Sequence, residues 1–244
     1  PLPAATSHPL DPSFSQLRES APGIMEEPQE DTEAGALIAD ACRWLLREHE
    51  IPERIDVVID ISVTGEHNYP SLHARIRLVY RDEGDREEHY GLRVLLRANA
   101  TAYQNRLRAA MTASGIDRNL GFRKLVIIRP DAPPHGPATQ HLTQEFLDKG
   151  GCFLRPTEAD WKALRALRKM ESEKAAEWDA WLAARRPVSS LPLFQDAAQW
   201  LRQNLGLGNS HTGIAPSIEG PGGTNPTPPP VTLPEIGQFL PPKE

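Results

Sequence analysis

The sequence predicts an α/β protein with a mixed, partly parallel central sheet of about five strands flanked by helices. Two apolar runs of strand length, 90–96 and 124–128, support this prediction most directly. Between them, residues 101–114 place apolar side chains at helical spacing, and Gly115 follows where a helix would end. A helix between two strands is typical of a crossover that joins parallel strands. We therefore expect the two strands to be parallel and either adjacent or one strand apart.

Each remaining element of the core has its own local signal. The first helix has apolar residues along one face, with Asp31 or Thr32 as its N-cap. After it, the second of two strands alternates between apolar residues and histidine or arginine, as in a strand with one exposed face. A charged turn around Gly84 leads into the crossover. The expected elements are a helix from 31 to about 50, strands at 56–63 and 73–80, the crossover at 90–128, a helix at 139–149 and a strand at 152–154.

Composition divides the chain into four segments. Residues 1–30 contain six prolines and a run of acids, which predicts a disordered lead-in. Residues 31–156 contain the α/β core, and residues 157–205 form a C-terminal helical extension. Residues 206–244 contain seven glycines and nine prolines, which predicts a Pro/Gly-rich linker or tail. These flexible ends, and a first residue that is not methionine, lead us to expect a module of a larger protein.

The C-terminal extension is expected to contain a long helix at 158–185 and a short one at 193–205. Thr157 is placed to cap the long helix, with acids in its first turn. Its apolar side carries the candidate partner-binding residues Trp161, Trp178 and Trp181. These tryptophans either pack in the core or form an interface with a partner helix.

Charge is distributed unevenly, although the formal net charge is only −6. Residues 1–70 contain 14 acidic and four basic residues, whereas residues 71–130 contain 12 basic and six acidic residues. This basic region has two interpretations: a phosphate-binding patch across neighbouring strands, or ordinary arginines at the edges of the elements. The candidate nucleic-acid-binding residues are Arg75, Arg77, Arg93 and Arg97.

Cysteine and histidine patterns indicate neither a disulfide framework nor a metal site. Cys42 and Cys152 are the only cysteines, and the eight histidines show no HxH or HExxH spacing. Buried free thiols are typical of a reducing cytoplasm, which is the location we expect. The sequence has no apolar run of about 18 residues, so no membrane span is expected. It also lacks a glycine-rich phosphate loop and a G-x-S-x-G motif, and we expect no cofactor.

The order helix, three strands, helix, strand resembles the core of the restriction-endonuclease-like, or PD-(D/E)xK, nucleases. The strand at 124–128, the segment 151–156 and the helix with Trp161 and Leu164 look like the second half of the Mrr-type branch. The resemblance covers roughly residues 32–170 and rests on element order and hydrophobic pattern. It implies a divalent-metal site formed by an acid at the end of the second strand and an acid-x-Lys pair on the third.

The third strand departs from that catalytic pattern. Its aligned segment, 92–97, reads Leu-Arg-Val-Leu-Leu-Arg and contains neither an acid nor a lysine. The resemblance therefore implies a degenerate site. Candidates for displaced metal ligands are Asp82, Glu83 and Asp85 in the preceding turn, although a solvated charged turn is the simpler explanation of these acids. Glu33 matches an acid that some members carry on the first helix, where a first-turn acid is favourable in any protein.

Three functions are consistent with these observations. The first is a non-catalytic restriction-endonuclease-like module of a larger bacterial protein, adjoining an ATPase in antiviral defence or DNA processing. Such a module would bind DNA, RNA or a partner subunit, and we expect weak, salt-sensitive nucleic-acid binding without cleavage. The second is an active Mg²⁺-dependent nuclease that uses the acids of the 82–88 hairpin. The third is a protein-interaction scaffold that binds through the tryptophan-bearing helix.

Overall fold

A computed structural model describes residues 7–65, 68–173 and 176–206. Five strands form one sheet in the order β1-β2-β3-β4-β5. β2 runs antiparallel to both β1 and β3, whereas β4 runs parallel to β3 and β5 runs parallel to β4. The predicted mixed, partly parallel sheet is therefore confirmed. The strands are β1 (Ile55–Thr64), β2 (Pro70–Tyr80), β3 (Arg86–Val94), β4 (Arg123–Ile128) and β5 (Cys152–Leu154).

The crossover between β3 and β4 is present, and its two strands are direct neighbours. Its helix, α3 (Ala100–Ser114), begins after Asn99, whose side chain accepts a hydrogen bond from the Ala102 N–H at 3.0 Å. It ends at Gly115, which has φ 60°. A left-handed backbone at this position favours glycine, so both ends of α3 are set by local sequence.

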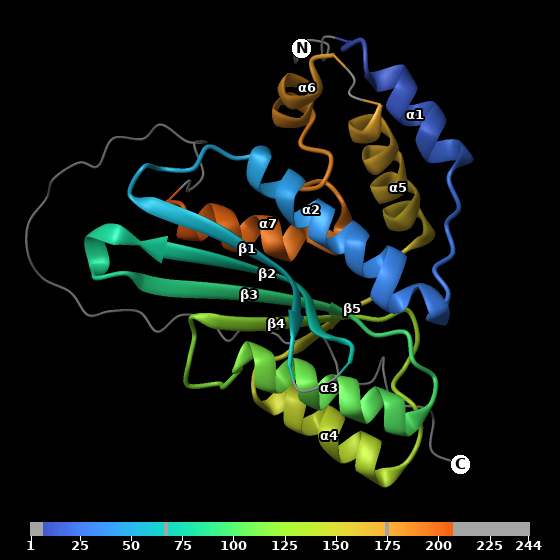
Figure 1. Cartoon of the computed structure of the whole chain (residues 1–244), viewed down its shortest axis with the longest axis vertical. Coiled ribbons are helices and arrows are strands. Elements are labelled where there is room, and N and C mark those ends of the chain that lie inside the picture. The colour runs from blue at the N-terminus through green and yellow to red at the C-terminus, as the bar shows by residue number, and fades with distance from the viewer. Residues whose placement is uncertain (1–6, 66–67, 174–175, 207–244) are drawn as a thin grey trace, which may run out of the picture.

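Helices cover both faces of the sheet (Figure 1). On one face, α3 and α4 (Pro137–Asp148) pack against Leu125 and Ile127 of β4. The other face receives Val126 and Ile128 of the same strand. β4 is thus buried on both faces, which explains why its sequence is continuously apolar. The helices packed on the second face are α2 (Gly35–Arg47), α5 (Glu158–Ser172), α6 (Trp178–Arg185) and α7 (Gln195–Asn204).

The N-terminal segment differs from the predicted disordered lead-in. Residues Asp11–Ser20 form helix α1, which packs against α5, and the Phe14 ring centroid lies 5.3 Å from that of Trp181 on α6. The chain then passes through a 3-10 turn, η1 (Glu27–Gln29), and a π-helical turn, η2 (Glu30–Ala34), directly into α2. Composition suggested disorder because the contacts that hold α1 come from residues far along the chain.

The long helix expected at 158–185 is instead two helices, α5 and α6, and Glu177 before α6 has φ 63°. Thr157 caps α5 as predicted, in a capping box with Asp160. The short helix expected at 193–205 consists of a 3-10 turn, η4 (Pro192–Phe194), followed by α7. Apart from residue 206, the predicted tail lies outside the described residues. No helix in the described ranges is long and apolar enough to cross a bilayer.

Candidate functional site

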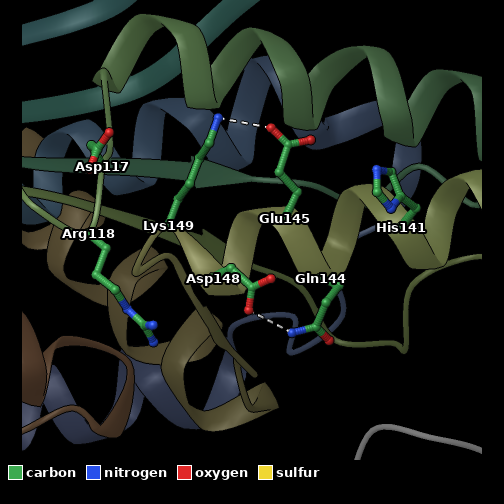
Figure 2. A pocket seen from close by; sticks show the side chains of 7 residues that line it. All are labelled: Asp117, Arg118, His141, Gln144, Glu145, Asp148 and Lys149. Carbon is green, nitrogen blue, oxygen red and sulfur yellow. Dashed lines mark hydrogen bonds and ion pairs between the residues drawn. The ribbon is translucent and has the colours of Figure 1, made fainter.

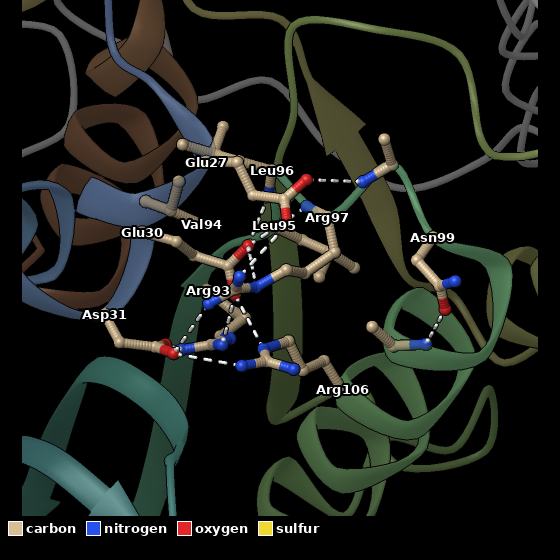
Figure 3. Close-up of polar contacts among 12 residues, drawn as sticks. Glu27, Glu30, Asp31, Arg93, Val94, Leu95, Leu96, Arg97, Asn99 and Arg106 are labelled. Carbon is tan, nitrogen blue, oxygen red and sulfur yellow. Dashed lines mark hydrogen bonds and ion pairs between the residues drawn. The ribbon is translucent and has the colours of Figure 1, made fainter.

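The C-terminal end of β3 lies against acids from the segment that precedes α2 (Figure 3). Arg93, the penultimate residue of β3, is completely buried. Its Nη2 donates a hydrogen bond to the Glu30 carboxylate at 2.7 Å, and its Nη1 lies 2.7 Å from the Asp31 carboxylate. Both acids belong to η2, so a guanidinium group joins the third strand to the start of the first core helix.

Glu30 is the most enclosed acid of this group and has partners on both oxygens. Its Oε2 accepts hydrogen bonds from the Leu96 N–H at 2.6 Å and the Arg97 N–H at 3.1 Å. Its Oε1 faces Arg93 and lies 2.8 Å from Nε of Arg106, a residue of α3. Burial raises the pKa of Glu30, and Arg93 and the Leu96 amide act in the opposite direction. Four donors from β3, α3 and the loop between them therefore surround one carboxylate.

His73 on β2 completes the buried side of the group. Its Nδ1 accepts a hydrogen bond from the Val94 N–H at 3.2 Å, and its Nε2 contacts both Asp31, at 3.2 Å, and Nη1 of Arg93. Burial lowers the pKa of His73 to about 4, which keeps the ring neutral at pH 7. Burial also raises the pKa of Asp31, but hydrogen bonds from His73 and Arg93 hold it below the ordinary range.

An outer layer closes the arrangement. Arg97 contacts Glu27 at 3.0 Å, and Glu27 also accepts a hydrogen bond from the Ala98 N–H at 3.1 Å. We define the ion cluster as Glu27, Glu30, Asp31, Arg93, Arg97 and Arg106, with His73 beside it. The ion cluster contains three acids and three arginines, so its formal charge is zero. The carboxylate oxygens of its acids already contact nitrogen donors.

The ion cluster leaves little capacity for a divalent metal. Mg²⁺ needs several oxygen ligands in near-octahedral order, and a buried guanidinium group beside them repels it. Across the described residues, no group of three or more His, Cys, Asp or Glu side chains is placed to hold a metal ion. The arrangement is suited to fixing the N-terminal segment against the sheet.

The four candidate nucleic-acid-binding arginines do not form one exposed row. Arg75 and Arg77 lie side by side with Asp60 of β1, at 2.8 and 2.9 Å, and Arg77 also lies 3.2 Å from Glu87. Arg97 is partly exposed but belongs to the ion cluster, and Arg93 is buried within it. Each of the four therefore has a carboxylate partner within the chain, and Arg93 does not reach the surface.

The candidate ligands Asp82, Glu83 and Asp85 are exposed in the turn between β2 and β3. Glu83 pairs with Arg86 at 2.7 Å, at the first residue of β3. The turn and the ion cluster thus lie at opposite ends of a nine-residue strand, roughly 26 Å apart at about 3.3 Å per residue. The structure does not bring these acids together with the residues at the other end of β3.

The candidate partner-binding tryptophans are all buried in the core. Trp161, Trp178 and Trp181 are 4%, 7% and 1% exposed, respectively. Trp178 and Trp181 stack with their ring centroids 5.5 Å apart, and the Trp181 Nε1–H donates a hydrogen bond to Asp11 at 2.9 Å. Their surroundings favour the core-packing interpretation, because none of the three rings presents a free face to a partner.

An open depression lies between α4 and the loop that follows α3 (Figure 2). Its volume is about 380 Å³. Four of the lining residues interact in two pairs: Lys149 forms an ion pair with Glu145 at 2.9 Å, and Gln144 donates a hydrogen bond to Asp148 at 2.9 Å. The depression therefore offers mixed charges and no set of converging groups of one kind. Asp117, Arg118 and His141 complete the lining.

Sequence reasoning missed Glu30, Asp31 and His73 as members of a site. Asp31 was expected to cap the first helix, but its side chain instead faces His73 and Arg93. Glu33, expected as a first-turn acid, lies 2.7 Å from Arg165 of α5. Two signals were available: an arginine inside the buried run of β3, and an acidic segment that precedes a basic one.

The chain matches no family model, no curated protein and no solved structure. Its function must therefore be argued from the geometry of its own residues.

Proposed function

We propose that the chain is a non-catalytic restriction-endonuclease-like module of a larger bacterial protein, and that it works by binding. The element order from α2 through β1, β2, β3 and α3 to β4 is the order on which the resemblance rests. The observation that carries the proposal is the ion cluster at the C-terminal end of β3. There, an arginine stands where a working nuclease of this class would need its metal ligands.

The residues around the second and third strands support the absence of catalysis. An active member of this class needs an acid on the second strand and an acid-x-Lys pair on the third. At the corresponding end of β3, this chain has Arg93, and His73 lies beside it on β2. The nearby acid Glu30 already accepts hydrogen bonds from two backbone N–H groups and from Arg93. No carboxylate of the cluster is left to activate water.

Ion pairing favours a protein ligand over a phosphate backbone. Arg75, Arg77 and Arg97 are the partly exposed members of the candidate patch, and each already contacts a carboxylate. A phosphate would have to displace that carboxylate, so nucleic-acid binding is expected to be weak and to decline steeply with salt. A partner subunit is therefore the ligand that we propose, with nucleic acid as the alternative that the experiment tests.

The test is a cleavage and binding assay with the purified chain. Single- and double-stranded DNA and RNA are incubated with Mg²⁺ or Mn²⁺, and we expect no cleavage. Binding is followed by fluorescence anisotropy from low to physiological salt, and we expect only weak binding that is lost as salt rises.

Two outcomes would contradict this proposal. Metal-dependent cleavage that disappears in Asp82→Ala/Glu83→Ala/Asp85→Ala, but not in the control Glu173→Ala, would establish the nuclease alternative. Tight nucleic-acid binding at physiological salt that Arg75→Ala/Arg77→Ala abolishes would replace the protein ligand by nucleic acid.

A further inference from the structure

Strand β1 lies at one edge of the sheet, with β2 as its only strand neighbour (Figure 1). Within the described ranges, no backbone hydrogen bond joins residues 56–64 to any segment other than β2. From Ile55 to Ile61, β1 pairs with β2 without a register shift, and the irregular part follows, where Ser62 has φ 49°. From Ile55 to Ile61, β1 therefore presents a regular row of backbone donors and acceptors on its outer side.

Over residues 55–61, β1 has no lysine, proline or bulge, and its only charged side chains, Asp56 and Asp60, form ion pairs within the chain. Natural edge strands are protected by lysine, proline or an early bulge. Five large apolar side chains are exposed among the described residues, and two of them belong to β1. These are Val58, 36% exposed, and Ile61, 47% exposed. An unpaired edge that also exposes apolar side chains is typical of an interaction surface.

The sequence of β1 is complementary to itself in one antiparallel register. A two-fold axis perpendicular to the sheet keeps each side chain on its own face, so the axis must pass through a residue. With the axis at Ile59, Val57 lies opposite Ile61 of the second copy, and Val58 lies opposite Asp60. This register covers the exposed Ile61 and opposes no like charges.

Neighbouring registers fit less well. An axis at Val58 would place Asp56 opposite Asp60, and an axis at Asp60 would place that carboxylate opposite itself. An axis at Val57 would leave Ile61 without an apolar partner. The two acids do not otherwise oppose pairing, because Arg81 in the turn after β2 binds Asp56, and Arg75 and Arg77 of β2 both bind Asp60.

We propose that two copies of this chain associate through β1, antiparallel about Ile59, to form one continuous sheet of ten strands. Backbone hydrogen bonds supply the attraction, and the apolar row Val57, Ile59 and Ile61 fixes the register. The inference rests on the edge of the sheet alone, so it stands or falls independently of the proposed function.

The test measures the mass of the full chain by sedimentation equilibrium from low to high micromolar concentration. We expect a dimer that dissociates on dilution. Val58→Asp places two carboxylates opposite each other and should weaken the dimer, whereas Val58→Lys faces Asp60 and should not. Because the contact occurs twice, we expect at least about a fivefold difference in Kd between the two variants. Phe122→Asp is the matched control, since Phe122 is 38% exposed but lies outside β1.

Amide hydrogen exchange of the unmodified chain gives a second measurement that needs no substitution. The outward amides of residues 57–61 should be protected at high concentration and exchange faster on dilution. A monomer at every concentration would overturn the proposal. So would a dimer that Val58→Asp and Phe122→Asp affect equally, or protection of the outward amides of residues 57–61 that does not depend on concentration.

Discussion

Replacing Arg93 by methionine tests the role of the ion cluster most directly. The substitution keeps the apolar stem of the side chain but removes the guanidinium group that contacts Glu30 and Asp31. Removing one partner of a buried ion pair typically costs about 3–5 kcal/mol. Glu30 would retain Arg106 and two backbone N–H donors, so we expect a loss of about 3 kcal/mol, at the lower end.

The pH dependence of this loss has a definite sign. Burial already raises the pKa of Glu30, and loss of Arg93 removes an interaction that opposes the increase. A carboxyl group whose folded pKa exceeds its unfolded pKa lowers stability at high pH, and the penalty is relieved as the pH falls. The deficit of Arg93→Met relative to the unmodified chain should therefore shrink as the pH falls towards 4.5, the ordinary pKa of glutamate.

Urea unfolding of three variants provides the measurement. Arg81→Met is the matched control, because it removes an arginine from an exposed, solvent-screened pair with Asp56 and should change the stability little. The double variant Arg93→Met/Glu30→Gln also removes the Glu30 charge that has lost its partner, and should recover part of the lost unfolding free energy. A loss for Arg93→Met no larger than that for Arg81→Met would refute the reasoning that the cluster holds the segment before α2.

Three further predictions concern other buried groups. Burial lowers the pKa of His73 from 6.5 to about 4, so the unfolding free energy decreases as the pH falls between these two values. In His73→Gln this pH-dependent decrease should be smaller, by about 3 kcal/mol at most, in urea unfolding measured across that range. Glu48 accepts hydrogen bonds from the Val188 and Ser189 N–H groups at 2.7 and 2.8 Å, so Glu48→Ala should cost about 2–3 kcal/mol in urea unfolding, and an unchanged midpoint would contradict this. Trp181→Ala should cost about 3–5 kcal/mol and accelerate amide exchange in α1, whereas a tryptophan used only for partner binding would leave both unchanged.

The sheet was predictable from sequence because its signals are local. The runs at 90–96 and 124–128 are apolar over consecutive residues, and the helix between them ends at a glycine, so no long-range information was needed. The ion cluster was not predictable in this way, because Glu30 and Arg93 are 63 positions apart. Asp31 also had a sufficient local explanation as an N-cap, which hid its contact with His73. Arg93 was the useful exception: a single arginine inside a buried strand requires an acid from elsewhere in the chain.

The position of α1 has a consequence for the order of folding. Asp11 accepts hydrogen bonds from Trp181 at 2.9 Å and from Arg185 at 2.7 Å, across 170 and 174 positions of the chain. During synthesis α1 emerges before the sheet, whereas Trp181 and Arg185 emerge only after the whole sheet has been made. Helix α1 must remain undocked until then, because the residues that stabilise it have not yet been made and closing so long a loop is slow. A chain shortened to begin at residue 31 would keep every strand but would uncover Trp181 on α6, beside the face of α5 that α1 packs against.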